Sequence, residues 1–186
     1  MALKIALAKY ACPSSEDMKA AVRNVPDFPE PGIQFKDITP ILADHELMRF
    51  AVDTMAARWA DAGITKVIGI ESRGFLLGAM LAERMDVGFV PVRKMGKLPY
   101  TTLQETYDLE YGTDTIEMHI DALSDGDRVL IHDDVIATGG TAAASHRLVE
   151  SAGAQLVGYC FLIELSFLKG RNLLDPSIPM QSLLDY

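Results

Sequence analysis

Short apolar runs alternate with helical patterns between residues 66 and 165, and this alternation limits the possible folds more than any other feature. Runs of strand length lie at 66–70, 87–93, 128–132 and 155–165, and helical patterns lie at 75–85 and 141–152. Sequences of this kind form a sheet of parallel strands joined by crossover helices. We therefore predict an α/β fold with a mostly parallel central sheet flanked by helices on both faces. Ligands should bind beyond the carboxyl ends of its strands.

The amino-terminal third is less regular. Residues 2–23 have an amphipathic helical pattern that is broken at 12–15, where Ser14 or Ser15 can cap the second piece. Four prolines in 25–40 exclude a regular helix or a central strand, so we predict an ordered loop there. A helical period then begins at Asp44 and ends before Gly63.

A hairpin is predicted in the middle of the chain. Residues 98–106 have no clear period, but 107–111 and 115–120 read as strands on either side of a turn at Gly112.

Composition sets the broad class. The chain has 186 residues, 49% hydrophobic and 23% charged, which suits one globular domain covering 1–186. The net charge of −9 argues against a nucleic-acid partner, and no apolar run reaches membrane-spanning length. Two cysteines do not make a disulfide framework. We expect a cytoplasmic protein without a membrane partner.

The segment 128–141 carries the clearest chemistry. A buried strand is followed by Asp133 and Asp134, then by the small residues 137–141, then by a helix start. Glycines at a helix amino terminus let backbone N–H groups approach a phosphate. Two carboxylates would repel that phosphate, so they more plausibly accept hydrogen bonds from hydroxyls or attract a divalent cation. A phosphate beside a vicinal diol describes a ribose 5-phosphate.

This segment resembles the phosphoribosyl diphosphate signature of the type I phosphoribosyltransferases. Four further motifs resemble the members of that family that act on adenine, and they stand in the same order at 25–38, 70–75, 92–99 and 109–112. The resemblance implies a reaction in which adenine and 5-phospho-α-D-ribose 1-diphosphate give AMP and diphosphate with Mg²⁺. It also implies an amino-terminal hood at 1–40, a mobile lid loop and hairpin at 95–120, and a homodimer.

The resemblance assigns roles to residues at the ribose phosphate. The 5-phosphate cradle consists of Ala137, Thr138, Gly139, Gly140 and Thr141. Asp133 and Asp134 would hold the ribose hydroxyls, directly or through magnesium-bound water, and we expect no direct protein ligand to the metal. Arg73 would hold the diphosphate, next to a Glu71–Ser72 peptide that is often cis in this family.

Two further groups belong to the leaving group and the lid. Arg93, Lys94 and Lys97 form a basic cluster that would stabilise the charge of the departing diphosphate and reach the neighbouring subunit's site. Glu110 and Tyr111 lie at the base of the predicted lid, where Glu110 would handle a proton at a purine ring nitrogen. Tyr107 would help to close the lid.

The base would be held by the amino-terminal segment. Phe35 is expected to stack on adenine opposite Val135 or Ile136, while the backbone of Gln34 reads the base edge. Lys36 departs from the family pattern, in which an arginine is usual, and lysine lacks the planar fork of arginine. His132 also stands where an aliphatic residue is usual.

Each of these residues has a plainer interpretation. The cradle could be an ordinary strand–helix turn, Phe35 a core residue, Glu110 a surface residue of a hairpin, and the basic cluster a solvated loop. Two alternative functions remain open: transfer to another purine base, and a non-catalytic regulator that senses phosphoribosyl diphosphate. Xanthine-specific relatives tend to carry Ala-Asn-Gly-Gln-Ala where this chain has the cradle, and purine repressors carry a basic domain ahead of the fold.

Overall fold

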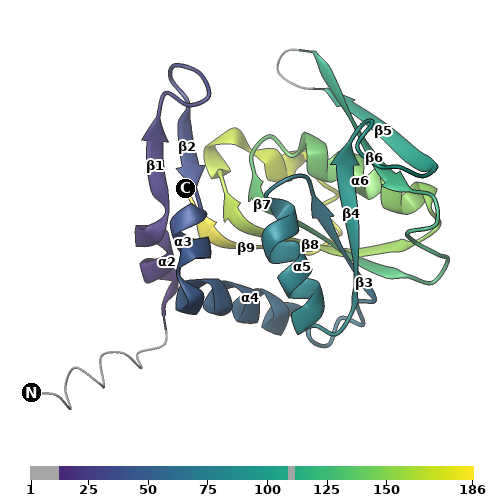
Figure 1. The fold of residues 1–186 in the computed structure, drawn as a ribbon, viewed down its shortest axis with the longest axis horizontal. Coiled ribbons are helices and arrows are strands. Elements are labelled where there is room, and N and C mark those ends of the chain that lie inside the picture. Colours follow the sequence, from purple (N-terminus) through teal and green to yellow (C-terminus); the bar gives the residue numbers. More distant parts are fainter. Residues whose placement is uncertain (1–12, 109–111) are drawn as a thin grey trace, which may run out of the picture. The chain divides into compact units, whose positions relative to one another are not determined.

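The computed structural model describes residues 13–108 and 112–186 and divides the chain into two compact units, residues 1–51 and 52–186. Figure 1 labels the helices and strands of both units. The larger unit contains a seven-stranded sheet with its helices, and the smaller one contains a two-stranded sheet with short helices.

The smaller unit begins with α2 (Ser15–Ala21), which Ser14 caps as one of the two predicted serines. The Ser14 hydroxyl accepts from the Asp17 N–H at 3.2 Å, and the Asp17 carboxylate accepts from the Ser14 N–H at 2.9 Å. This reciprocal pair satisfies two N–H groups that the helix itself leaves unbonded.

The predicted loop at 25–40 is wrong in part. β1 (Arg23–Pro26) and β2 (Gln34–Asp37) form an antiparallel pair, and α3 (Thr39–Ala43) follows. The prolines occupy tolerated positions: Pro26 ends β1, and Pro40 lies in the first turn of α3, where its missing N–H has no helical partner to lose.

The next helix matches its sequence signal. α4 (His45–Trp59) starts after Asp44, whose carboxylate accepts from the N–H groups of Glu46 at 2.9 Å and Leu47 at 3.1 Å. The predicted helix with its start at Asp44 and its end before Gly63 is confirmed.

The main sheet has the strand order β5-β6-β4-β3-β7-β8-β9. Its parallel members are β3 (Lys66–Ile70), β4 (Gly88–Lys94), β7 (Arg128–Ile136), β8 (Gln155–Glu164) and β9 (Met180–Asp185). The hairpin strands β5 (Thr102–Asp108) and β6 (Thr113–His119) pair antiparallel at one edge. The predicted mostly parallel sheet and hairpin are confirmed.

Three strand predictions need correction. β5 begins within the stretch that showed no period, because an edge strand is only half-buried and keeps polar residues on both faces. β7 continues past residue 132 to Ile136, so the acid pair lies within the paired strand. β9 was not predicted, since its polar residues hide the pattern.

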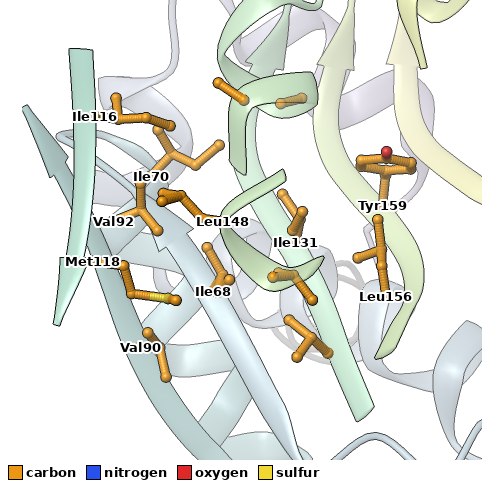
Figure 2. Close-up of a cluster of buried hydrophobic side chains, with 14 of the residues drawn as sticks. Ile68, Ile70, Val90, Val92, Ile116, Met118, Ile131, Leu148, Leu156 and Tyr159 are labelled. Atoms are coloured by element: carbon orange, nitrogen blue, oxygen red, sulfur yellow. The ribbon is translucent and has the colours of Figure 1, made fainter. Parts of the chain in front are cut away.

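Helices cover both faces of this sheet. α6 (Gly140–Ser151) packs on one face, where Leu148 meets the aliphatic side chains of β3, β4 and β7 (Figure 2). On the other face, α5 (Gly74–Arg84) approaches closely, because a Cβ at Gly78 would lie 3.1 Å from the ring of His132. Gly158 likewise leaves room for the Trp59 ring, because a Cβ at residue 158 would collide with that ring. Two short 3-10 turns, η1 (Ser166–Leu168) and η2 (Gly170–Leu173), link β8 to β9.

No helix of the described residues combines the length and apolar character needed to cross a bilayer.

His132 lies on the α5 face and has no exposed surface. Burial lowers its pKa to about 4, so the folded protein keeps the ring neutral where the unfolded chain already binds a proton. Stability should therefore fall as pH drops from about 6.5 to 4.

We predict that His132→Leu removes this loss. Relative to wild type, the variant should gain roughly 1 kcal/mol of unfolding free energy per pH unit across that window. Urea denaturation at pH 8, 6 and 5 and at equal protein concentration measures the difference. The raised pKa values of the nearby carboxyls increase stability as the pH falls, which is opposite to the effect of His132. This contribution is common to wild type and His132→Leu, so it cancels in the difference. His45→Gln, at an exposed position, is the control, and a constant difference between wild type and His132→Leu at all three pH values would contradict the prediction.

Candidate functional site

The crevice follows from the order of the strands. The chain leaves β3 through α5 to reach β4 on one side, and it leaves β7 through α6 to reach β8 on the other side. β3 and β7 are parallel neighbours, so their carboxyl ends lie next to each other while the connections diverge. Ligands bind at such a switch point in open α/β sheets. The predicted motifs at residues 71–74 and 133–141 both fall there.

The acid pair lies at the end of β7. Asp134 is 4% exposed, and its Oδ2 lies 2.9 Å from Nε of Arg73. Oδ1 of Asp133 accepts from the N–H of Asp134 at 2.8 Å. The start of α5 lies directly against the pair, because a Cβ at Gly74 would be 2.7 Å from Oδ1 of Asp133. Two segments that are distant in sequence, 73–74 and 133–134, therefore meet at two carboxyl groups.

Both carboxyl groups are in an unfavourable place for a charge. Burial and the neighbouring Asp134 raise the pKa of Asp133 well above its usual value. Burial also raises the pKa of Asp134, although the Arg73 guanidinium opposes that shift. Hydroxyl donors or a cation placed against the pair would stabilise its charged form. The site is thus suited to a polyhydroxylated ligand.

The cradle follows the acid pair in the chain. Gly139 has φ = 86° and stands at the amino terminus of α6, a helix of 12 residues. The free backbone N–H groups there form the positive end of the helix dipole, which favours an anion. A pocket at this point is lined by Asp133, Val135, residues 136–142 and Phe161. The cradle and Asp133 therefore line one pocket.

A second backbone segment supports the cradle, and sequence reasoning missed it. A Cβ at Gly170 would collide with the carbonyl oxygen of Ala137, and one at Gly139 would collide with the carbonyl oxygen of Gly170. Arg171 anchors this segment through both carboxylate oxygens of Glu164, at 3.1 and 2.6 Å. The contact joins residues about 30 positions apart, so no local pattern in the sequence signals it.

The hairpin lies against the other side of the cradle. A Cβ at Gly140 would be 3.1 Å from the ring of Tyr107, whose hydroxyl interacts with Thr141 and donates to Asp114 at 3.4 Å. Arg147 of α6 binds Glu105 of β5 at 2.8 Å. Tyr107 thus lies beside the cradle, and its role in closing the lid stays a prediction. Glu110 and Tyr111 lie outside the described residues.

The predicted basic cluster is not isolated from acids. Arg93 donates to both oxygens of Glu71 at 3.1 Å and to the carbonyl of Lys97 at 3.1 Å. Nζ of Lys94 lies 3.2 Å from Asp114. Arg93, first among several influences, lowers the pKa of Glu71 and keeps it charged. The Glu71–Ser72 peptide is cis, as the family resemblance implied.

The residues predicted to hold the base belong to the smaller unit. Gln34 is exposed, and Phe35 packs edge-on against Phe28 with ring centroids 5.1 Å apart. Nζ of Lys36 donates to Asn24 at 2.6 Å, while burial, followed by the charge of Lys19, lowers the pKa of Lys36. Stacking of a base between this unit and Val135 or Ile136 stays a prediction.

Comparison with known proteins finds similar proteins that match most of this chain. The phosphoribosyl transferase domain family matches residues 40–178. Adenine phosphoribosyltransferase of Maricaulis maris is 54% identical over 171 residues, which cover 91% of this chain and 98% of the relative. Among solved structures, the adenine phosphoribosyltransferase of Rhodothermus marinus is 63% identical with a TM-score of 0.90, covering 92% of this chain and 98% of that one. The yeast enzyme, solved with adenine and an imino-altritol bisphosphate, is 43% identical with a TM-score of 0.86, covering 91% and 98%.

The contact between Gly170 and the cradle yields a test. Gly170 has no positive φ, so alanine is compatible with its backbone, and the collisions with the backbone of Ala137 and Gly139 are what oppose it. We predict that Gly170→Ala displaces the cradle and weakens ribose 5-phosphate binding by roughly tenfold or more, on the order of 1.4 kcal/mol. Titration calorimetry measures the affinity. Gly88→Ala is the control, because its Cβ would meet only the flexible end of Lys66, and equal affinities in the two variants would refute the supporting role.

Proposed function

The chain belongs to the adenine phosphoribosyltransferases of the phosphoribosyl transferase family, and we propose that its crevice at the ends of β3 and β7 holds the substrates of that reaction. As a pentosyltransferase of purine salvage, it converts adenine and 5-phospho-α-D-ribose 1-diphosphate to AMP and diphosphate. The observation that supports this location best is the buried acid pair, with a helix amino terminus on one side and Arg73 on the other.

The charges in the crevice suit the parts of the substrate. The 5-phosphate would accept hydrogen bonds from the backbone N–H groups of 137–141. The ribose hydroxyls would donate hydrogen bonds to Asp133 and Asp134. The diphosphate, which carries the most negative charge, would then lie toward Arg73 and the basic cluster. Arg73 is about one third exposed, so it can turn from Asp134 toward an incoming anion. The residues thus order the substrate from phosphate to diphosphate along the crevice.

The chemical step requires a dry and positively charged environment. As the bond between the ribose C1 and the diphosphate oxygen breaks, positive charge develops on the sugar and negative charge on the leaving group. Arg73 and Lys97 would stabilise the leaving group, and carboxylates near the sugar would stabilise its cationic character. Tyr107 and the hairpin would exclude water, which otherwise competes with adenine. Glu110 would hold or accept the proton of the attacking ring nitrogen.

A metal ion would arrive with the substrate. Among residues 13–108 and 112–186, no three side chains of His, Cys, Asp or Glu come together as a metal site. Mg²⁺ commonly binds through substrate phosphates, water and one or two carboxylates, and Asp133 with Asp134 can contribute in that way. When bound, the ion neutralises part of the diphosphate charge.

The assembly and the location also remain proposals. We propose a homodimer in which the segment 93–97 reaches the partner's crevice, and a cytoplasmic location. The family resemblance supports the first, and the low cysteine content supports the second. Sedimentation equilibrium of the purified protein would test the dimer.

Replacement of the acid pair tests the location of the ribose. The double variant Asp133→Asn with Asp134→Asn should lose turnover by roughly 10³-fold or more, comparable to other losses of catalytic electrostatic contacts. Its melting temperature should stay equal or rise, because two unfavourable buried charges are removed. Steady-state rates and calorimetric melting measure the two effects. The matched control replaces the exposed Asp121 and Asp125 with asparagine, and a double variant with wild-type rates would exclude the acid pair from the site.

Glu110→Ala tests the handling of the proton. Single-turnover rates with adenine should fall by roughly 10²-fold or more, while adenine affinity changes far less. Rapid quenching measures the rate and equilibrium dialysis measures the affinity. Glu105→Gln, on β5 of the hairpin, controls for disturbance of the lid. An unchanged single-turnover rate in Glu110→Ala would exclude Glu110 as the proton-handling group.

A further inference from the structure

Glu117 is a buried carboxylate on β6 that the proposed mechanism does not use, and one of its oxygens binds the backbone of the segment 94–98. It is 2% exposed. One oxygen accepts from the N–H groups of Lys97 and Leu98, both at 2.9 Å. The other accepts from the hydroxyl of Thr102 at 3.3 Å and the amide of Gln104 at 3.4 Å. A buried charge with this set of donors is satisfied.

The segment 94–98 is folded around this carboxylate. Gly96 has φ = 80°, a conformation that glycine adopts readily and that turns consecutive N–H groups toward one point. Burial tends to raise the pKa of Glu117, but hydrogen bonds from the N–H groups of Leu98, Gly96 and Lys97 outweigh burial and lower it. The carboxylate is thus the internal anion of a small anion-binding nest.

Arg93 holds the same peptide from the opposite side. Its Nη1 donates to the carbonyl of Lys97 at 3.1 Å, while the rest of the guanidinium is fixed by Glu71. Arg93 and Glu117 are direct partners across the β4–β6 pair. Arg93 and Glu117, which are charged neighbours, therefore bind the backbone of residue 97 at both its carbonyl and its N–H.

We propose that Arg93 and Glu117 form a backbone clamp that positions Lys97 for the diphosphate. The Lys97 side chain is exposed, so the clamp fixes the backbone and leaves the ammonium group accessible. In this arrangement Glu117 is a positioning residue, and Arg93 acts at least in part through the peptide of Lys97. The inference rests on the proposed role of Lys97 in binding the diphosphate.

A double-mutant cycle tests the clamp in the full-length enzyme. Glu117→Ala should raise the KM for phosphoribosyl diphosphate by roughly tenfold, as expected for loss of one charge-assisted contact, and should leave the KM for adenine within twofold. Lys97→Ala should raise the same KM, and adding Glu117→Ala to it should have little further effect. Fully additive effects would overturn the proposal. Asp53→Ala is the control, since it breaks an exposed ion pair with Arg84 at the far end of α5.

A second readout does not depend on catalysis. Hydrogen exchange at the amides of Lys97 and Leu98 should be at least several-fold faster in Glu117→Ala than in wild type and unchanged in Asp53→Ala. Glu117→Gln retains one acceptor oxygen, so both its exchange rates and its KM should lie between wild type and alanine. If Lys97→Ala leaves the KM unchanged, the proposed role of Lys97 fails even where exchange supports the clamp. Unchanged exchange in Glu117→Ala rejects the clamp itself.

Discussion

Close approach of backbone to backbone around the end of β7 is the constraint on which the site depends. The start of α5 reaches Asp133 only because residue 74 is glycine, and the cradle meets the turn at Gly170 only because both lack a Cβ. These contacts place a helix amino terminus, an acid pair and the Arg73 segment within one small region. Side chains at the glycine positions would push the three segments apart. The geometry of the site thus depends first on the absence of a Cβ atom at these glycine positions.

The buried acid pair lowers the stability of the folded protein. Two adjacent carboxyl groups with raised pKa values destabilise the free protein, and a single arginine contact offsets only part of this. In the proposed function, ribose hydroxyls that donate to the pair would remove this penalty as the substrate binds, and so would add to its affinity. Unfavourable groups of this kind are expected where function requires them.

Local sequence signals predicted most of the fold and part of the site. The apolar runs of β3, β4 and β8 and the glycine-rich start of α6 are local patterns, and each was found. β9 was missed because its polar residues serve distant partners: Gln181 accepts from the indole of Trp59 at 2.9 Å. Gly170 and Glu117 were missed for the same reason, since their contacts lie 13 to 33 positions away in the sequence. Periodicity reports burial along one element and not the partners across elements.

The three cations of the basic cluster have different surroundings in the fold. Read as sequence, Arg93, Lys94 and Lys97 are three equivalent cations. In the fold, Glu71 and Asp114 engage the first two, while the third has an exposed side chain and a clamped backbone. The acids lower the net positive charge of the segment, yet they fix its shape. A rigid segment would lose less conformational entropy on binding a diphosphate than three unconstrained lysine and arginine side chains would. In the proposed function, the fixed shape of this segment would therefore contribute to binding along with its positive charges.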